Sequence, residues 1–154
     1  MMKWMFLPLK RYADFSGRSR RREYWMFFLF QVIAITLITM IAMVFGDFSF
    51  DPSDYLDASG TFDASRDLPS GIGLLVGLFS IYALATFIPV LAVQVRRLHD
   101  TDRSGWWVLL SVIPVINYIG FLVLLVFYCL EGNKGKNRFG EDPKRDQNTH
   151  EVFE

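Results

Sequence analysis

The sequence gathers arginines in two short segments, and guanidinium groups are the side chains best suited to bind phosphate and carboxylate. The first segment spans 18–22, and the second lies in V-R-R-L-H-D-T-D-R-S-G-W-W, 95–107. An arginine held directly against a bilayer can gain about 1 kcal/mol from anionic lipid. We therefore expect these arginines to bind anionic lipid headgroups or an acidic partner. The set is Arg18, Arg20, Arg21, Arg22, Arg96, Arg97 and Arg103.

Acidic side chains in the same segments can neutralise some of this charge. Glu23 directly follows the first segment, and we expect it to form an ion pair with a basic group there or in 95–107. If a helix continues through Arg97, then Arg96 and Asp100 lie four residues apart on one face. The second segment would then partly neutralise itself and still present net positive charge.

His99 could titrate near neutral pH or bind a metal. No second histidine or cysteine stands at ligand spacing, so we favour a hydrogen-bonded histidine at the membrane interface. The aspartates of 47–69 lack the D-x-D-x-D-G ligand pattern of calcium sites. Motifs of serine hydrolases, zinc proteases and dinucleotide enzymes are also missing. We expect no metal, no cofactor, no catalytic residue and no nucleic-acid partner.

Three uncharged runs must position these groups. They cover 24–46, 68–95 and 105–130. As helices they would be roughly 35 to 42 Å long, enough to cross a hydrocarbon core of about 30 Å. The sequence thus predicts an all-α, polytopic transmembrane helical bundle. We expect one membrane domain over 1–143, with spans of about 24–46, 70–95 and 105–130 and an acidic extracytoplasmic loop at 47–69, followed by a flexible tail, 144–154.

The third run allows two interpretations. Pro114, Asn117 and Gly120 stand near its centre, a pattern typical of a broken helix. One kinked span would place the C-terminus outside, and its length favours this interpretation. A re-entrant hairpin would return the C-terminus to the side of 95–107, but it must be buried against other helices.

The distribution of charge predicts the orientation. Seven Lys/Arg precede Tyr24 against two acids, whereas 47–67 holds six Asp and one Arg. Because Lys/Arg-rich segments stay inside, we expect the N-terminus and 95–107 in the cytoplasm. Trp25, Trp106 and Trp107 begin apolar runs, where aromatic side chains form belts at headgroup depth.

Prolines interrupt two of the expected helices. Residues 2–12 have the amphipathic pattern of a helix in the cytoplasmic interface, and Pro8 favours a helix that starts there. Pro89 should kink the second span and free a backbone carbonyl.

Small and polar residues in the spans have mainly structural interpretations. We expect Thr36 and Thr39 to bond their own helix and Gln31 to reach another helix or the interface. Gly73 and Gly77 form a small-x-x-x-small pair that would let another helix approach closely.

Several of these segments together resemble a known family. They are F-S-G-R at 15–18, R-x-E-Y-W at 21–25, R-R-L-H-D-T-D-R-S-G-W-W at 96–107 with I-P following, and N-R-F-G-E-D-P at 137–143. They are similar to the domain of unknown function 805 family, which implies a polytopic bacterial inner-membrane protein and no known activity, ligand or partner. The loop 47–67 departs from the family pattern. The residues expected to form its structural motif are Glu23, Trp25, His99, Asp100, Ser104, Gly105, Trp106, Trp107, Asn137, Arg138 and Gly140.

Two classes of function fit these features. The first is a membrane interaction or scaffold protein with a basic cytoplasmic face, whose partners are the bilayer, further copies of itself or another membrane protein. The second is a transporter or channel subunit that uses helix breaks at Pro89 and Pro114. Ionisable residues are missing from the spans, which favours the first class.

Overall fold

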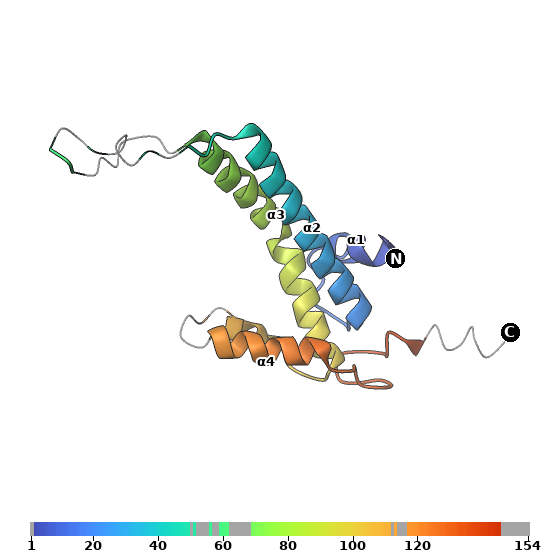
Figure 1. The fold of residues 1–154 in the computed structure, drawn as a ribbon. Helices are drawn as coiled ribbons and strands as arrows, with labels where there is room; N and C mark the ends of the chain where they lie inside the picture. Colours follow the sequence, from blue (N-terminus) through green and yellow to red (C-terminus); the bar gives the residue numbers. More distant parts are fainter. Residues whose placement is uncertain are drawn as a thin grey trace. The chain divides into compact units, whose positions relative to one another are not determined.

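The computed structural model shows a chain folded into helices. It covers residues 2–49, 51, 56, 59–61, 69–111, 113 and 117–145, without the side chains of Met2 and Asn117. The elements are α1 (Met2–Lys10), α2 (Arg21–Phe45), α3 (Ser70–Asp100), the 3₁₀ helix η2 (Gly105–Ser111) and α4 (Asn117–Cys129) (Figure 1). No strand occurs in these ranges. The expected all-α class is therefore confirmed.

The chain forms two compact units. The terminal unit comprises residues 1–30 and 86–154, and the central unit comprises residues 31–85. Helices α2 and α3 each contribute to both units.

In the central unit, α2 and α3 form a tight hairpin. The Gly71 N–H donates to the Asp47 carbonyl at 2.8 Å, and a methyl group on Gly46 would overlap the backbone of Gly71. Further along, the Tyr82 hydroxyl donates to the Gln31 side chain, so the interhelical bond expected of Gln31 is confirmed. The aspartates at 54, 57, 63 and 67 of the acidic loop lie outside the described residues.

The predictions made for the threonines and the glycines of the α2–α3 hairpin have different outcomes. Thr36 and Thr39 donate to the carbonyl four residues before them, at 2.8 and 3.0 Å, as expected. The pair Gly73 and Gly77 has no described atom within 4 Å of an added methyl group. Close helix approach in this unit therefore occurs at Gly46, and the small-x-x-x-small prediction is wrong for contacts within the described chain.

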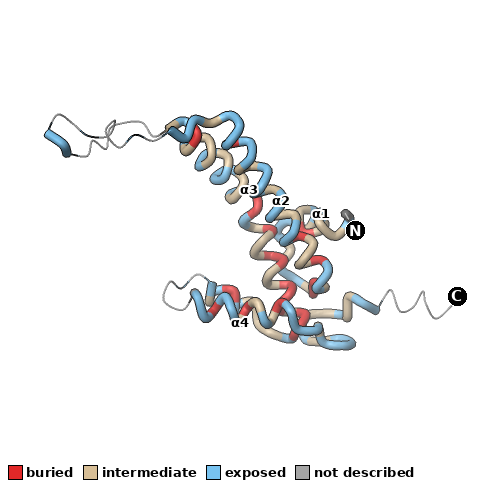
Figure 2. Tube along the Cα trace, viewed as in Figure 1, coloured by how far each residue is buried: buried red, intermediate tan, exposed pale blue. Residues whose placement is uncertain are grey.

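Helices α2 and α3 are long, apolar and little covered by the rest of the protein. They have 25 and 31 residues, and only 11% of the most apolar stretch of each is buried. Outward-facing side chains such as Phe45 and Leu84 are 78% and 77% exposed. Figure 2 shows that most of the length of both helices in the central unit is coloured exposed or intermediate. Apolar faces of this extent need a nonaqueous environment, which a bilayer provides.

The run 105–130 does not form one helix, which corrects the single span favoured by its length. Helix η2 packs antiparallel on α4: the rings of Trp107 and Phe127 are 5.4 Å apart, and a methyl group on Gly120 would lie 2.6 Å from the Leu110 carbonyl. The hairpin interpretation therefore fits the structure. Pro114 explains the break, because proline lacks an N–H and disfavours helix in the residue before it; its own placement lies outside the described residues.

A small apolar core joins the hairpin of η2 and α4 to α3. Leu98 of α3 is fully buried with Val108 of η2 and with Leu124 and Tyr128 of α4. Tyr24 of α2 packs its ring against that of Tyr128 at 4.5 Å. The core holds the start of α2, the end of α3 and the end of α4 together.

Pro8 and Pro89 both lie inside helices. Helix α1 runs from Met2 through Pro8 to Lys10, so a helix that starts at Pro8 is wrong. Pro8 comes near the end of α1 and is fully buried, so packing of its ring offsets the one backbone bond that it cannot make. Pro89 is also fully buried, and α3 continues through it.

Candidate functional site

An ion pair between α2 and α3 lies in the interior of the terminal unit. The Arg96 guanidinium lies 3.1 Å from the Glu23 carboxylate, and the two residues are 0% and 3% exposed. Arg96 also donates to the Asp14 carbonyl at 2.7 Å, and its own carbonyl accepts from Ser19 N–H at 3.0 Å. The ion pair expected of Glu23 is present, and its partner comes from the segment 95–107.

A second buried group centres on the Asp100 carboxylate. It accepts from Arg97 at 2.7 Å and from Arg18 at 3.0 Å, one on each oxygen. The remaining guanidinium donors reach backbone carbonyls at the end of α4 and beyond it: Arg97 donates to Tyr128 at 3.2 Å, and Arg18 donates to Gly135 at 2.6 Å. Buried charges are tolerated when they are paired and hydrogen-bonded in this way.

These contacts correct the expected headgroup-binding set at three positions. Arg96 and Arg97 are 0% exposed and Arg18 is 5% exposed. Their guanidinium groups are directed to internal carboxylates and carbonyls. Of the expected set, only Arg20, Arg21, Arg22 and Arg103 therefore remain candidates for headgroup binding.

The segment after α4 closes over the end of α3. The Phe139 ring stacks on that of His99, with centroids 3.8 Å apart and planes 4° from parallel. Asn137 donates its side-chain amide to the His99 carbonyl at 2.8 Å, and His99 Nδ1 lies 3.2 Å from the Gly17 carbonyl. Arg138 pairs with Asp102 at 3.2 Å. His99 is thus hydrogen-bonded, as expected, and its stacking on Phe139 is an addition that the sequence did not predict.

Two glycines of the motif occupy positions where a larger residue would be strained or would clash. Gly140 has φ +141°, in a region that side chains avoid, and it forms a backbone bridge with Asn137. A methyl group on Gly105 would lie 2.7 Å from the Val95 side chain. Both residues of the motif are therefore needed where the chain turns or packs.

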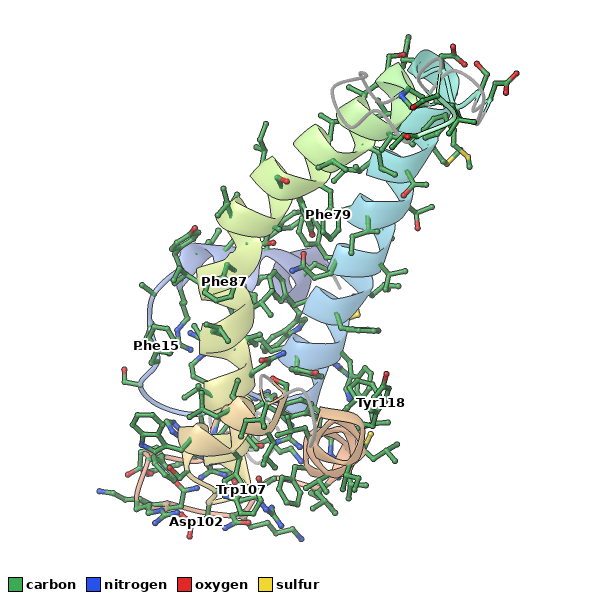
Figure 3. All side chains as sticks on the ribbon, turned by 90° about the vertical axis from the view of Figure 1, so that its left-hand side faces the viewer. Phe15, Phe79, Phe87, Asp102, Trp107 and Tyr118 are labelled. Atoms are coloured by element: carbon green, nitrogen blue, oxygen red, sulfur yellow. The ribbon has the colours of Figure 1, made fainter. Side chains whose placement is uncertain are left out.

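The tryptophans of the motif remain accessible. Trp106 is 77% exposed and Trp107 is 43% exposed. The Trp106 N–H lies 3.5 Å from the Ser104 hydroxyl, so Ser104 helps to begin η2. Figure 3 shows Trp107 and Asp102 at the same end of α3. Trp25 packs edge-on against Tyr24.

Gly132 and Asn133 belong to this site and were not singled out in the sequence. A methyl group on Gly132 would overlap the Asp100 carboxylate. The Asn133 N–H donates to the Asp100 carbonyl at 2.8 Å, and its carbonyl accepts from Arg18. No local pattern marks these two residues, because their role depends on a partner more than 30 positions away.

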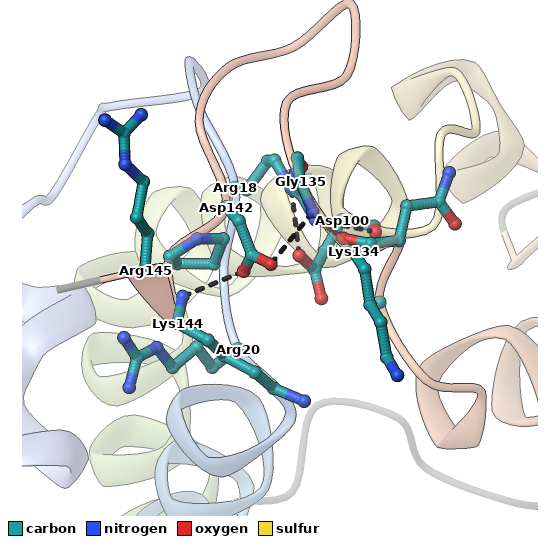
Figure 4. Close-up of a pocket in the computed structure, with 11 residues that line it drawn as sticks. Arg18, Arg20, Asp100, Lys134, Gly135, Asp142, Lys144 and Arg145 are labelled. Carbon is teal, nitrogen blue, oxygen red and sulfur yellow. Dashed lines mark hydrogen bonds and ion pairs between the residues drawn. The ribbon is translucent and has the colours of Figure 1, made fainter. Parts of the chain in front are cut away.

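Half-buried and exposed cations surround a cleft beside this buried network. One cavity of about 400 Å³ adjoins a second of about 260 Å³, and both include Arg20 and Lys144 in their walls. Figure 4 shows the residues that line the first cavity. Arg103 lies elsewhere, 4.0 Å from the ring of Phe127. The basic residues around the two cavities, apart from buried Arg18, are Arg20, Arg21, Arg22, Lys134, Lys144 and Arg145.

One carboxylate at the edge of the cleft is held ionised. Asp142 accepts the backbone N–H of Lys144 at 2.8 Å and that of Gly135 at 3.1 Å. Although burial acts to raise it, these hydrogen bonds keep the pKa of Asp142 below its ordinary value. Over the described ranges, His, Cys, Asp and Glu do not gather in groups of three that could hold a metal ion.

Comparison with known proteins now assigns the chain to a family. The profile of the family described as "Protein of unknown function (DUF805)" matches residues 12–141. The chain belongs to this family. It is 46% identical over 143 residues to inner membrane protein YhaI of Escherichia coli K12, covering 93% of this chain and 97% of the relative. It is 41% identical to inner membrane protein YhaH of the same strain, with coverages of 93% and 98%.

No solved structure gives a significant match to the chain. The family membership confirms the resemblance stated from the sequence. The DUF805 family has no assigned activity, so its function must be argued from the geometry of the site.

Proposed function

We propose that this DUF805 protein is a membrane interaction protein of the bacterial inner membrane whose charged end binds anionic phospholipid headgroups. The observation that supports the proposal is the division of the basic residues. Arg18, Arg96 and Arg97 are buried on internal acceptors, whereas six other cations surround one cleft at the surface. The buried group builds the scaffold, and the second group lines the cleft, where a ligand can reach it.

Phospholipid is the ligand that fits the position of this cleft. Arg21 and Arg22 begin α2, and the uncharged run of that helix starts directly after Glu23. Basic side chains next to a membrane-spanning helix lie at the depth of lipid phosphates, where each contributes about 1 kcal/mol of attraction. The contacts would be screened by salt within about 8 to 10 Å.

The orientation that follows places this charged end in the cytoplasm. The N-terminal segment and the residues after α4 both contact the end of α3, so they share one side. Together these segments carry most of the Lys and Arg of the chain. The positive-inside rule then assigns that side to the cytoplasm.

The test is a lipid competition in nanodiscs that contain the full chain and equal amounts of phosphatidylglycerol and phosphatidylcholine. We expect the protein to retain phosphatidylglycerol preferentially after detergent extraction, and the preference to fall as salt rises from about 0.05 to about 0.5 M. Equal retention of the two lipids, or a preference that salt does not change, would contradict the proposal.

A transporter or channel subunit is the second candidate, favoured by the break between η2 and α4. Irregular backbone at membrane depth is tolerated where it is buried in protein or lines a polar pathway. Flux of an ion through liposomes that contain only this protein would support this function. A flux equal to that of empty liposomes would leave headgroup binding as the function of the chain.

A further inference from the structure

We infer that the two adjoining cavities form a single site for a phospholipid headgroup with two phosphates, that of cardiolipin (diphosphatidylglycerol). The inference rests on the proposed function and makes it specific. A diffuse basic surface would attract any anionic lipid, whereas a shaped site binds one molecule and distinguishes among them.

The division of cations between the cavities carries the argument. The first cavity has Lys134 and Arg145 in its wall, and the second has Arg21 and Arg22. Arg20 and Lys144 belong to both, as do Asp100 and Gly132. Each cavity thus has cations of its own in addition to Arg20 and Lys144, which line both cavities. Two phosphates joined by a short linker can occupy this arrangement, with one phosphate in each cavity.

The carboxylates near the cleft cancel only part of this charge. Asp142, ionised in the wall of the first cavity, is held by the backbone N–H groups of Lys144 and Gly135. Asp100 is already paired with Arg18 and Arg97 in the interior. Lys144 pairs with Glu131 at 3.1 Å and Arg145 with Glu141 at 2.8 Å, but all four side chains are more than half exposed. Exposed pairs of this kind are worth about 0 to 1 kcal/mol, so a phosphate can displace them.

The walls of the second cavity point to a lipid as the source of the phosphates. Trp4 of α1 lines this cavity, with its ring 5.6 Å from the Arg20 guanidinium. Helix α1 is held against the apolar stretch of α2 by the edge-on contact of Phe6 and Phe30, 5.3 Å apart. Tryptophan beside basic residues is typical of the bilayer interface, and basic pockets at the cytoplasmic ends of spanning helices are known cardiolipin sites.

The chain offers matched variants for a test. Arg22 and Lys134 are exposed and line different cavities. Lys10 and Lys136 are also exposed, lie in the neighbouring segments and line neither cavity. The test variant is R22Q/K134Q and the control is K10Q/K136Q, which removes the same charge. Thermal unfolding of both should match the wild type, because all four residues are at the surface.

The measurement is native mass spectrometry of the detergent-solubilised full chain, titrated with cardiolipin or with phosphatidylglycerol at equal phosphate. We expect one cardiolipin per chain, bound at least tenfold more tightly than phosphatidylglycerol. In R22Q/K134Q the affinity should fall about tenfold or more, whereas K10Q/K136Q should keep it. Inorganic pyrophosphate, added as a soluble competitor, should displace the lipid only at far higher concentration.

Three results would overturn the site. They are equal affinity for the two lipids at matched phosphate, loss of cardiolipin equally in both variants, and displacement by pyrophosphate at the lipid's own concentration, which would assign the site to a soluble anion. If the nanodisc preference for phosphatidylglycerol persists in any of these cases, only the cardiolipin site fails. If that preference is missing, the proposed function fails as well.

Discussion

Replacing Glu23 by glutamine should destabilise the protein more than the loss of any charge at its surface. Glutamine keeps the shape and one acceptor oxygen, so the change removes the charge that faces Arg96. That guanidinium is completely buried, and the next carboxylate, on Asp14, is 4.0 Å away with its side chain 35% exposed to water. The variant therefore leaves a buried cation with backbone carbonyls as its main partners.

The magnitude follows from the pairing. Breaking a buried ion pair by removing one partner typically costs about 3 to 5 kcal/mol. The amide oxygen of glutamine can still accept a hydrogen bond from Arg96, which returns about 1 kcal/mol. We expect a loss of about 2 to 4 kcal/mol in the free energy of unfolding. Lys144→Gln, which breaks the exposed pair with Glu131, should cost less than about 1 kcal/mol and serves as the control.

The assay is equilibrium unfolding in mixed micelles, followed by circular dichroism. A second variant, Arg96→Met, and the double variant complete a double-mutant cycle. Because the double variant removes both charges, it should be less destabilised than the sum of the two single changes, by at least about 1 kcal/mol. Additive effects, or a Glu23→Gln protein within about 0.5 kcal/mol of the wild type, would refute the role assigned to this pair.

Three further predictions use the same micelle assay or a simple fusion. Gly132→Ala should destabilise the protein by about 1 to 3 kcal/mol, because its methyl group would overlap the Asp100 carboxylate, whereas Gly73→Ala in open space should stay within about 1 kcal/mol. Hydrogen bonds from Ser16, then the Arg11 guanidinium, lower the pKa of Asp14 from 3.8 to about 2. The stability that Asp14 contributes should thus be complete above about pH 4 and disappear as pH falls to about 2, so that wild type and Asp14→Asn converge there. Reporters fused to the two ends of the chain should report the same side of the membrane; opposite sides would contradict the hairpin.

The long apolar elements could be predicted because composition alone determines them. A run of more than about 20 uncharged residues must be a helix if it meets lipid, since only a helix satisfies its own backbone there. Helices α2 (Arg21–Phe45) and α3 (Ser70–Asp100) accordingly coincide closely with the runs 24–46 and 70–95. The third run has the same composition, but it divides into η2 and α4 in the part of the run that contains Pro114, and length cannot show this.

The role of each arginine could not be predicted from the chain. The residues next to Arg96 and Arg97 in the sequence do not distinguish these buried arginines from exposed arginines at a membrane interface. Whether a guanidinium faces lipid or the interior depends on which carbonyls reach it, and here these come from Asp14, Tyr128 and Gly135. The sequence predicted that Glu23 forms an ion pair, because an acidic residue beside several arginines is expected to pair with a basic group. It did not determine which of the two basic segments supplies the partner.

The buried network also explains why the chain must turn back between η2 and α4. The donors of Arg97 and Arg18 find their acceptors at Tyr128, Leu130, Asn133 and Gly135. If residues 105–130 crossed the membrane as one helix, these carbonyls would lie on the opposite side. The buried guanidinium groups would then lose acceptors at about 1 to 3 kcal/mol for each group left unsatisfied. The hairpin is thus the topology that satisfies the charges, and the segments around Arg18, Arg96 and Asn137 act as one structural unit because each supplies bonds that the others need.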